Sequence, residues 1–406
     1  MGIPGLLLAV QDAIEVTNIS KYKGKKAGID GFVWAHRGCL SCGREIAKGI
    51  QTRKYINYFF KQLQPLIDNR IKPLVVFDGD DFPAKKITNE IRRNKRSEHI
   101  KIAEEYEKRG LITEAEFHYN KSVEITPQVL YPLIQELKKK GINFIVAPYE
   151  ADAQLAFLAN NNFVDFVITE DSDLLVYKCP HTIYKLERNG NCHSLILSNI
   201  FKIKEFAGMT QKMFVECCVL SGCDYLPSIS KMGIKTAAKK MQIYHSGKAV
   251  LSSLKLEGKW EIPDNYEENF EKVCLIFYQQ RIFDPKTKTI HGIYDNGYSN
   301  FIETNITNDE AIGIAYGRLN PKTHEPFSED NEYQSESDSH KSLNTTLYTV
   351  KISKSVLQDF KPHVNSYIPI KPKKNTPLHP LQNINSNSIS QKKFTPPSIR
   401  NLQFKL

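Results

Sequence analysis

Short apolar runs alternate with stretches of helical periodicity along the first three quarters of the chain. Five of these runs are rich in Val, Ile, Phe or Leu. They predict β-strands at residues 26–30, 73–77, 143–146, 166–169 and 182–186. Strands that are separated by helices favour a parallel sheet with helices on both of its faces. The pattern therefore predicts an α/β fold.

Helix signals lie between the predicted strands. A helix between the first two strands is indicated by apolar residues that recur every four positions: Tyr55, Phe59 and Leu63. Residues 113–116, Thr-Glu-Ala-Glu, match a capping box and predict that a helix begins there. Thr126 followed by Pro127 predicts a second helix start, and Gly141 after three lysines predicts the end of that helix.

The pattern changes near residue 328. Residues 329–406 are poor in large apolar side chains and rich in Ser, Asn and Pro. Such a segment cannot bury enough apolar surface to offset the entropy of the chain. We expect a folded core at 1–328 and a disordered tail at 329–406.

Charge adds a hint about the partner. The chain of 406 residues has a formal net charge of +10, which suggests a polyanion. Residues 360–406 contain eight basic residues and no acid, whereas residues 329–359 sum to −3 and residues 1–328 to +5. Residues 360–406 therefore carry most of the excess positive charge, and DNA binding by the core needs separate support. No apolar run reaches the length of a membrane span, and the N-terminus lacks the basic region of a secretory leader.

The eight cysteines give one short motif, the Cys-x-x-Cys of Cys39 and Cys42. No second pair stands at zinc-finger spacing. Reduced thiols of an intracellular protein are the simpler interpretation, and a zinc site is the alternative.

Acidic residues gather where the predicted strands end. The first strand ends at Asp30, and Asp78 follows the second. The third and fourth strands lead into paired acids, Glu150 with Asp152 and Asp171 with Asp173. Ligands of open parallel sheets bind outside the carboxyl ends of the strands, so six carboxylates are predicted to share one crevice. A two-residue spacing places both members of a pair on one side of an extended strand, or around a cation in a loop.

Crowded carboxylates resist common ionisation, and hard divalent cations such as Mg²⁺ relieve that repulsion. Two such ions about 4 Å apart can hold the attacking and leaving oxygens of a phosphoryl displacement. The alternative is that each acid only forms a turn or caps a helix. The repetition at four strand ends favours a metal site.

A basic segment follows Asp78. Residues 85–96 contain six basic residues and one acid. Lys85, Arg92 and Arg96 would form one stripe of a helix that draws in a phosphate or tracks a single strand. A solvated charged face is the alternative.

Residues 221–241 form a second candidate contact with nucleic acid. Asp224 opens a turn-rich stretch, and Gly233 leads into a helix rich in Ala and Lys. A helix N-terminus presents free N–H groups to a phosphate, and Lys235 adds charge there. This pattern is typical of backbone binding without base reading.

Several of these segments together resemble a known family. They are MGIPGLL at the N-terminus, VFDG around Asp78, APYEADAQLA, TEDSDLL and SGCDYL. The set resembles the structure-specific 5′ nucleases of the flap endonuclease and exonuclease 1 family over about residues 1–320. The segments VAPYEADAQLA, SGCDYL, RKYINYFFKQLQPL and IKPLVVFDG favour the exonuclease 1 branch.

The resemblance implies a PIN-like 5′ nuclease fold: a mostly parallel twisted sheet flanked by helices, with a helical arch and a helix-two-turn-helix element. Its N-terminal part would span about 1–99 and its internal part about 120–300. It implies two Mg²⁺ ions, with Mn²⁺ as a substitute, held by seven acids: Asp30, Asp78, Glu150, Asp152, Asp171, Asp173 and Asp224. Lys85 and Arg92 would act at the scissile phosphate from the arch.

Further positions follow from the same resemblance. DNA contacts would come from Phe32, His36, Arg93, Arg96, Lys185, Gly233 and Lys235. Phe32 stands where relatives often have Tyr, so a hydroxyl has no counterpart here. Backbone carbonyls of Ser221, Ser228 and Met232 would hold a K⁺ ion, although the loop SISKM replaces a commoner version that contains glycine.

The expected function is a Mg²⁺-dependent 5′→3′ exonuclease on double-stranded DNA that also cuts 5′ flaps. Its substrates would be DNA with 5′ ends, nicks, gaps or flaps, in repair or recombination. The alternatives are a flap endonuclease of replication, a non-catalytic junction-binding scaffold and a related ribonuclease. We expect a monomer without membrane contact. Mismatch-repair proteins are candidate partners of the tail, and KPKK at 371–374 is a weak nuclear signal that leaves a mitochondrial location open.

Overall fold

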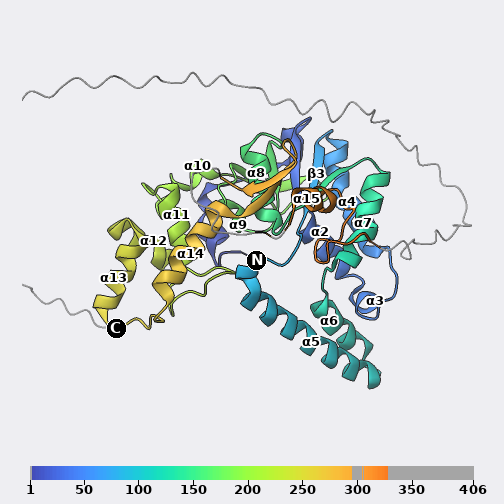
Figure 1. The fold of residues 1–406 in the computed structure, drawn as a ribbon, viewed down its shortest axis with the longest axis horizontal. Helices are drawn as coiled ribbons and strands as arrows, with labels where there is room; N and C mark the ends of the chain where they lie inside the picture. The colour runs from blue at the N-terminus through green and yellow to red at the C-terminus, as the bar shows by residue number, and fades with distance from the viewer. Residues whose placement is uncertain (1, 295–303, 305, 328–406) are drawn as a thin grey trace, which may run out of the picture. The chain divides into compact units, whose positions relative to one another are not determined.

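The computed structural model describes residues 2–294, 304 and 306–327 of the chain. Its centre is a seven-stranded sheet with the order β1-β7-β6-β5-β2-β3-β4 (Figure 1). The strands are β1 Ile14–Asn18, β2 Lys26–Asp30, β3 Lys72–Phe77, β4 Asn143–Val146, β5 Phe166–Ile168, β6 His181–Tyr184 and β7 Asn191–Ile196.

The five predicted strands form the parallel part of this sheet. Strands β6, β5, β2, β3 and β4 pair in parallel, and β2 lies between β3 and β5. All three residues of β5 are buried, as are four of the five residues of β2. Strands covered on both faces show continuous apolar runs rather than alternation, which is why these runs were readable in the sequence. The predicted α/β class is confirmed.

Helices cover both faces of the sheet. Helices α2 (Gly31–Cys39) and α4 (Lys54–Asp68) pack on the face of β3 that carries Val75 and Phe77. There the Phe59 ring lies 6.3 Å from that of Phe77. Helix α8 (Ala151–Asn160) packs on the opposite face, where a Cβ at Gly28 would lie 3.0 Å from the Leu155 side chain. The absent side chain at position 28 lets α8 approach the sheet closely.

The other helices build the surroundings of the sheet. The short N-terminal elements are α1 (Leu6–Ala9), η1 (Gln11–Ala13) and η2 (Ile19–Tyr22), followed later by α3 (Gly43–Ala47). A 3₁₀ turn, η3 (Pro83–Lys85), leads into the long helix α5 (Lys86–Lys108), which packs against α6 (Ile112–Ser122). Figure 1 shows these two helices side by side, as the predicted arch requires.

The C-terminal half of the described core is mainly helical. Its helices are α7 (Pro127–Lys139), α9 (Asp173–Val176), α10 (Leu197–Ile200), α11 (Gln211–Leu220), α12 (Ile234–Tyr244), α13 (Gly247–Glu257), α14 (Tyr266–Gln279) and α15 (Asn308–Ala315). A hairpin of β8 (Arg281–Asp284) and β9 (Thr289–Gly292) packs on α8. The buried amide of Gln154 bonds both the N–H and the carbonyl of Phe283, at 2.8 Å each, and so closes the edge of β8.

Local sequence signals predicted the ends of α7 correctly and the start of α6 wrongly. The Thr126 hydroxyl caps α7 by accepting from the Val129 N–H, and Gly141 ends that helix with a φ of 65°, so both predictions are confirmed. The capping box at 113–116 is wrong. Helix α6 begins at Ile112, and its N-cap, Leu111, has no side-chain hydrogen bond. The preceding Gly110, with a φ of 76°, reverses the chain so tightly that helix begins before Thr113 can cap it.

Strands β1 and β7 were not predicted. Both are antiparallel additions at one edge of the sheet, with β1 on β7 and β7 on β6. Strand β1 is half-exposed, and its Val16 is 74% exposed, so it lacks the continuous burial that marks the parallel strands. Among the helices described, none combines the length and apolar character that crossing a membrane requires. The predicted tail and its KPKK segment lie outside the described residues.

Candidate metal centre and nucleic-acid interface

The carboxyl ends of the parallel strands bring the predicted acids together. Asp30 is the last residue of β2 and caps α2, because its Oδ1 accepts from the Val33 N–H at 3.2 Å. Its other oxygen accepts from the Thr169 hydroxyl at 2.9 Å. Asp78 follows β3 and accepts from the Ala151 N–H at 2.7 Å, which ties this acid to the first turn of α8. Turns after neighbouring strands thus aim these carboxylates at one edge of the sheet.

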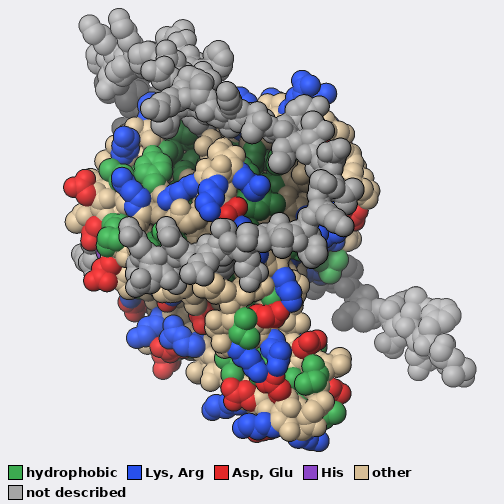
Figure 2. All heavy atoms as spheres, turned by 90° about the vertical axis from the view of Figure 1, so that its right-hand side faces the viewer, with side chains coloured by type: hydrophobic (Ala, Val, Ile, Leu, Met, Phe, Trp, Pro, Cys, Tyr) green, Lys and Arg blue, Asp and Glu red, His purple; other side chains and the backbone are tan. Residues whose placement is uncertain are grey.

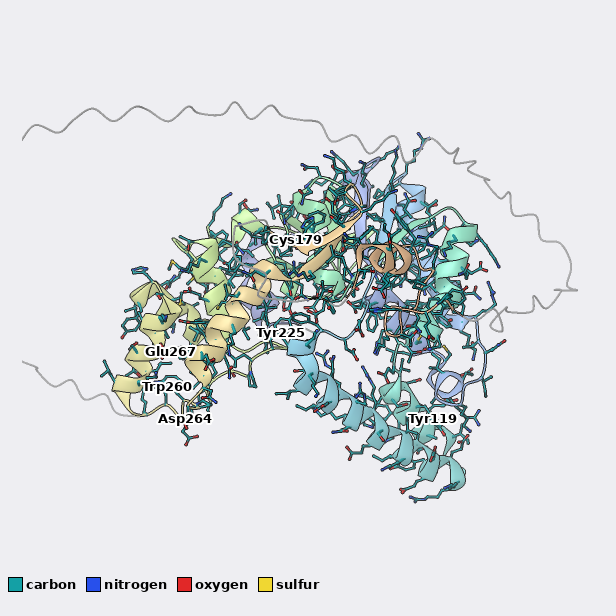
Figure 3. All side chains as sticks on the ribbon, in the orientation of Figure 1. Tyr119, Cys179, Tyr225, Trp260, Asp264 and Glu267 are labelled. Atoms are coloured by element: carbon teal, nitrogen blue, oxygen red, sulfur yellow. The ribbon has the colours of Figure 1, made fainter. Side chains whose placement is uncertain are left out.

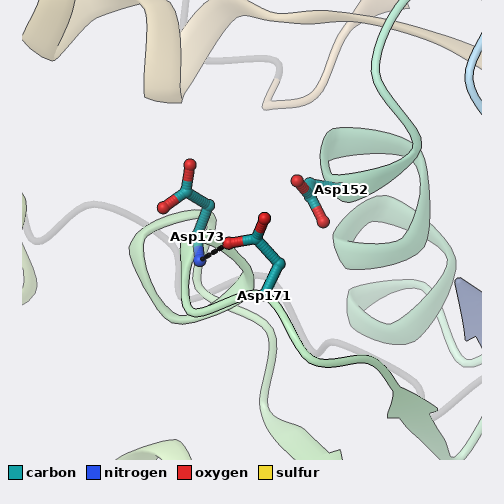
Figure 4. Close-up of side chains that lie close together, drawn as sticks. All are labelled: Asp152, Asp171 and Asp173. Atoms are coloured by element: carbon teal, nitrogen blue, oxygen red, sulfur yellow. Dashed lines mark hydrogen bonds between the residues drawn. The ribbon is translucent and has the colours of Figure 1, made fainter. Parts of the chain in front are cut away.

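Three further acids form a tight group. Asp152 lies in the first turn of α8, Asp171 follows β5, and Asp173 begins α9. Each offers a carboxylate oxygen, and these oxygens all lie within 4.8 Å of one another (Figure 4). The Asp173 N–H donates to Asp171 Oδ1 at 3.1 Å. The paired acids therefore lie in turns and at helix starts rather than on extended strand ends. Of the two arrangements that the two-residue spacing allowed, the structure has the loop around a cation site and not the extended strand.

Burial and mutual repulsion oppose ionisation of these carboxyl groups and so raise their pKa values. Burial, followed by the charge of Asp78, raises the pKa of Asp30 to about 7. Burial also raises the pKa of Asp78 to about 6. The pKa values of Asp152 and Asp173 are raised well above the ordinary range, by burial and then by Asp171. A cluster of acids that oppose one another's charge favours binding of a cation.

Two observations test whether the acid cluster fits a metal ion. Asp173 Oδ1 is buried and has no hydrogen-bond partner among the described residues, so it is an acceptor in need of a donor or a cation. Gly2, with a φ of 79°, lies so close that a Cβ there would be 2.1 Å from Asp171 Oδ1 and 2.7 Å from Asp173 Oδ1. The oxygen-only donor set suits Mg²⁺. The residues therefore fit hard divalent cations.

The remaining two acids, Glu150 and Asp224, form ion pairs with Lys85 and Arg92, the two cations predicted to act at the phosphate. Lys85 Nζ lies 2.6 Å from Glu150 Oε1 and 2.9 Å from Asp224 Oδ2. Arg92 donates to both oxygens of Asp224 at 2.9 Å, and Thr88 donates to the Asp224 backbone carbonyl at 2.6 Å. Burial opposes the Lys85 charge, yet the two carboxylates raise its pKa well above the usual value. The start of α5 is thus fixed over the acids by its own cations.

Sequence reasoning missed the polar groups around Glu150. The Tyr225 hydroxyl donates to Glu150 Oε2, and the Tyr177 hydroxyl lies 3.0 Å from that of Tyr225. The buried Gln280 amide donates to the same carboxylate oxygen at 3.3 Å. Figure 3 places Tyr225 beside the first turn of α5, where Lys85 Nζ lies 6.0 Å from the centre of its ring. Tyr225 stands in SGCDYL directly after Asp224, which was the available signal.

A cavity of about 160 Å³ opens beside this group and reaches under α5. The cavity is lined by Phe32 and by three arginines of α5: Arg92, Arg93 and Arg96. Arg93 lies 3.9 Å from Asp81, and Arg96 lies 3.1 Å from Glu124, so the basic stripe turns toward different partners along the helix. Figure 2 shows Lys and Arg side chains at a hollow on one face of the molecule.

The other predicted DNA contacts lie on several elements. His36 stands on α2, and burial followed by the charge of Arg96 lowers its pKa. Lys185 is exposed directly after β6, with its N–H bonded to Glu170 Oε1 at 3.0 Å. Gly233 caps α12 and Lys235 is exposed in its first turn. A Cβ at Gly233 would meet no atom within 4 Å, so packing does not require glycine there.

The predicted K⁺ ligands stand in the turns between α11 and α12. Ser221 ends α11, and Gly222 follows with a φ of 95°. Ser228 lies close to Gly222, and the Met232 N–H donates to the Ile229 carbonyl at 2.9 Å. K⁺ binding by this segment stays a prediction. For the zinc alternative, Cys39 and Cys42 are buried, and no third metal donor among the described residues joins them.

Matches to family models define the class of protein. Residues 1–99 match the XPG N-terminal domain, and residues 141–224 match the XPG I-region. All seven predicted acids fall within these two regions. Among solved structures, the catalytic core of Rad2 in complex with DNA substrate is 20% identical with a TM-score of 0.52, over 68% of this chain and 85% of that one. That likeness shows the fold.

Curated relatives narrow the class. Exonuclease 1 of Oryza sativa subsp. japonica is 37% identical over 336 residues, which cover 80% of this chain and 40% of the relative. Exodeoxyribonuclease 1 of Schizosaccharomyces pombe is 32% identical over 414 residues, which cover 97% of this chain and 71% of the relative. The chain belongs to the exonuclease 1 family, and the resemblance inferred from its motifs is confirmed. The chain spans less than half the length of its plant relatives.

Proposed function

We propose that the protein is a divalent-metal-dependent nuclease that removes nucleotides from 5′ ends of double-stranded DNA and also cuts 5′ flaps. The observation that carries this proposal is the group of Asp152, Asp171 and Asp173 next to cationic side chains at the start of α5. One buried oxygen of this group, Asp173 Oδ1, has no hydrogen-bond partner within the part of the chain that the structure describes. Acids that bind hard cations, placed beside Lys and Arg, suit a phosphodiester substrate better than any neutral one.

The metal ions would be held by the clustered acids. Asp30, Asp78, Asp152, Asp171 and Asp173 stand at the carboxyl edge of the sheet, and Glu150 and Asp224 lie at the start of α5. When bound, two Mg²⁺ or Mn²⁺ ions supply Lewis acidity at the phosphate and lower the pKa of water. None of these side chains needs to act as a covalent nucleophile. Their task would be to hold and orient the ions and to exclude water from the site.

Lys85 and Arg92 would then serve the phosphate directly. In the structure they neutralise Glu150 and Asp224. Positive charge fixed at this place stabilises the negative charge that develops on the phosphate oxygens during bond cleavage. Arg92, Arg93 and Arg96, which line the cavity, would contact the backbone of a strand that leaves the site. Gly233, Lys235 and Lys185 would contact the phosphate backbone of the duplex.

The relatives support DNA as the substrate, and we propose repair or recombination as the setting. The matched proteins bear the names exonuclease 1 and exodeoxyribonuclease 1, and the solved Rad2 core holds a DNA substrate. A role in DNA repair and the KPKK segment favour a nuclear location, with the mitochondrion as the alternative. Mismatch-repair partners of the tail, a K⁺ ion at residues 221–232 and a monomeric state complete the proposal.

One experiment tests reaction, polarity and metal need together. Duplexes labelled at the 5′ or the 3′ end, with a recessed end or a 5′ flap, are digested with Mg²⁺, with Mn²⁺ or with EDTA. We expect release of the 5′ label as mononucleotide, cleavage at the flap base and no product in EDTA. A binding scaffold would release nothing under any condition, and a pure flap endonuclease would spare the recessed end.

The acids supply the matched controls. Loss of a group that only orients a metal ligand costs 10- to 100-fold in activity, so Asp171→Ala and Asp173→Ala should each lower cleavage by more than about 100-fold. DNA binding should be largely retained, because the phosphate contacts lie elsewhere. Asp165→Asn alters an acid that caps the opposite end of the sheet through the Lys26 N–H and should leave cleavage unchanged. Near-normal rates in both alanine variants would sink the assignment.

A further inference from the structure

Two histidines face each other across the helix pair α5 and α6, apart from the acid cluster. His99 Nδ1 on α5 lies 2.9 Å from His118 Nδ1 on α6. The ring centroids are 5.1 Å apart and the ring planes are inclined by 48°. Both side chains are half-buried and so remain reachable from solvent. At this distance one ring donates its N–H to the lone pair of the other, and the tautomer decides which ring donates.

The surroundings hold the His118 ring in place. The Tyr106 ring stacks on His118 at 5.5 Å with an angle of 26°. The Phe117 ring meets the same imidazole edge-on at 5.3 Å. Beneath the rings, Ala103 and Ala115 are buried between the helices, where their small size permits close approach. Ring positions that are fixed before a ligand arrives reduce the entropy lost on binding.

The geometry matches a pair of metal ligands. Imidazole nitrogens bind Zn²⁺ at about 2.0–2.1 Å, so two of them at right angles or tetrahedral angles around one ion stand about 2.9–3.4 Å apart. The observed separation of 2.9 Å falls in this range. Among the described residues no third His, Cys, Asp or Glu donor joins the two rings, but both rings are reachable from solvent, so water can fill the remaining ligand positions. Imidazole favours zinc, copper and nickel, whereas Mg²⁺ prefers the oxygen donors of the acid cluster.

We propose that His99 and His118 form a binding site for a borderline transition-metal ion of the Zn²⁺ class, which ties α5 to α6. The ion would displace the proton that the two rings share and would lie to one side of the line between the two nitrogens, where water would complete its coordination. Because Lys85 caps the start of α5 and Arg92 lies on it, an ion at this site would stiffen the helix pair that stands over the acids. The proposal concerns binding alone and does not depend on nuclease activity.

The test titrates the full chain with Ni²⁺ in excess Mg²⁺, followed by calorimetry. Mg²⁺ keeps the oxygen sites occupied, so we expect one remaining Ni²⁺ site per chain. His99→Asn and His118→Asn should each weaken that site by at least about tenfold. His245→Asn is the matched control. His245 is exposed and has a φ of 58°, a conformation that Asn adopts readily. Equal Ni²⁺ affinity in wild type and in both variants would overturn the proposal.

Three further readouts keep the result interpretable. Far-UV circular dichroism establishes that each variant is folded before it is titrated. Ni²⁺ should slow hydrogen exchange of amides in α6, and Cu²⁺ should give a paramagnetic spectrum with two coupled nitrogens, lost in either variant. The Asp173→Ala protein should keep the Ni²⁺ site while it loses cleavage, which separates this proposal from the nuclease function. Loss of the Ni²⁺ site in Asp173→Ala would contradict it.

Discussion

At the scale of single residues, the candidate metal centre depends on groups that are not acids. Gly2 leaves room for the carboxylates of Asp171 and Asp173, and Ser172 between them accepts from the Ile3 N–H at 2.9 Å. The N-terminal segment is therefore fastened to the acid loop and forms one wall of the centre. Thr169 performs a similar task for Asp30. Side chains of this kind set the aim of the ligands, as outer-shell groups do in metal sites generally.

Gly2→Ala tests that wall. A Cβ would overlap Asp171 Oδ1, and a φ of 79° costs an L-residue about 1–2 kcal/mol. We expect the affinity for Mg²⁺ to fall about tenfold, measured by the Mg²⁺ dependence of cleavage and by calorimetry. Gly24→Ala is the control, since it has the same φ and no neighbour within 4 Å. An equal loss in both variants would mean that strain, and not contact with the acids, is responsible.

The raised pKa values of the acids predict a pH effect on the metal-free protein. Unfolded Asp titrates near 3.9, whereas the folded pKa of Asp30 is about 7 and that of Asp78 about 6. Between these limits the folded state binds more protons, so the free energy of unfolding falls as pH rises. In EDTA the melting temperature should therefore drop between about pH 4 and 7. Saturating Mg²⁺ should remove most of this drop, and a flat profile in EDTA would contradict the assignment.

At the scale of elements, the pair α5 and α6 is held at both ends. Lys85, Thr88 and Arg92 fix the start of α5 to the Asp224 turn. At the far end, Glu107 accepts from Arg44 Nε of α3 at 2.9 Å, from Lys48 at 2.7 Å and from the Tyr119 hydroxyl at 2.8 Å. At each end of the pair, Lys and Arg side chains form ion pairs with a carboxylate. The helix pair thus reaches the acids with its orientation already set.

Glu107→Gln should loosen the far end and leave the near end intact. The Arg44, Lys48 and Tyr119 contacts lower the pKa of Glu107 to about 2, so the carboxylate is charged at neutral pH and amide replacement removes the attraction. Exposed ion pairs contribute little, so the melting temperature should fall by no more than about 2 °C. Hydrogen exchange in α6 should rise. Glu105→Gln, one position from the contact network, should change neither quantity.

Arg92→Ala tests the contact between the start of α5 and the Asp224 turn. Loss of the arginine would remove charge from the proposed phosphate site and would leave Lys85 to pair with Asp224. A group that stabilises charge developing on the reacting phosphate is worth about 10²–10³ in kcat. We expect a loss of that size in single-turnover cleavage, with a smaller change in DNA affinity. Arg92→Lys should recover only part of the rate because it cannot bond both oxygens of a phosphate or carboxylate. Full activity of Arg92→Ala would remove this arginine from the mechanism.

At the scale of the whole molecule, sequence reasoning found the buried parallel strands and the strand-end acids because both leave continuous local signals. It missed β1 and β7, whose half-exposed residues show no such run. It also missed Tyr177, Tyr225 and Gln280, which meet Glu150 only after distant segments fold together. The pairing of Lys85 and Arg92 with acids required the same tertiary information.

Charge at this scale predicts the salt dependence of binding. Residues 360–406 add eight positive charges with no acid. Deleting them should lower the affinity for duplex DNA at low salt and flatten the slope of log affinity against log salt. The single-turnover cleavage rate at saturating protein should not change, since the acids and α5 are retained. A lower cleavage rate would assign the tail a part in the reaction itself.

The order of the strands has a consequence for how the protein folds. Strand β2 pairs with β3 and with β5, so Asp30 meets Asp171 only after about 140 intervening residues have been placed. Asp224 stands farther still along the chain. Folds dominated by such distant pairings have high contact order and form slowly. In refolding experiments, recovery of Mg²⁺ binding should therefore be among the last events, well after helical signal returns, and newly made chains would remain unable to cut DNA until the whole core has closed.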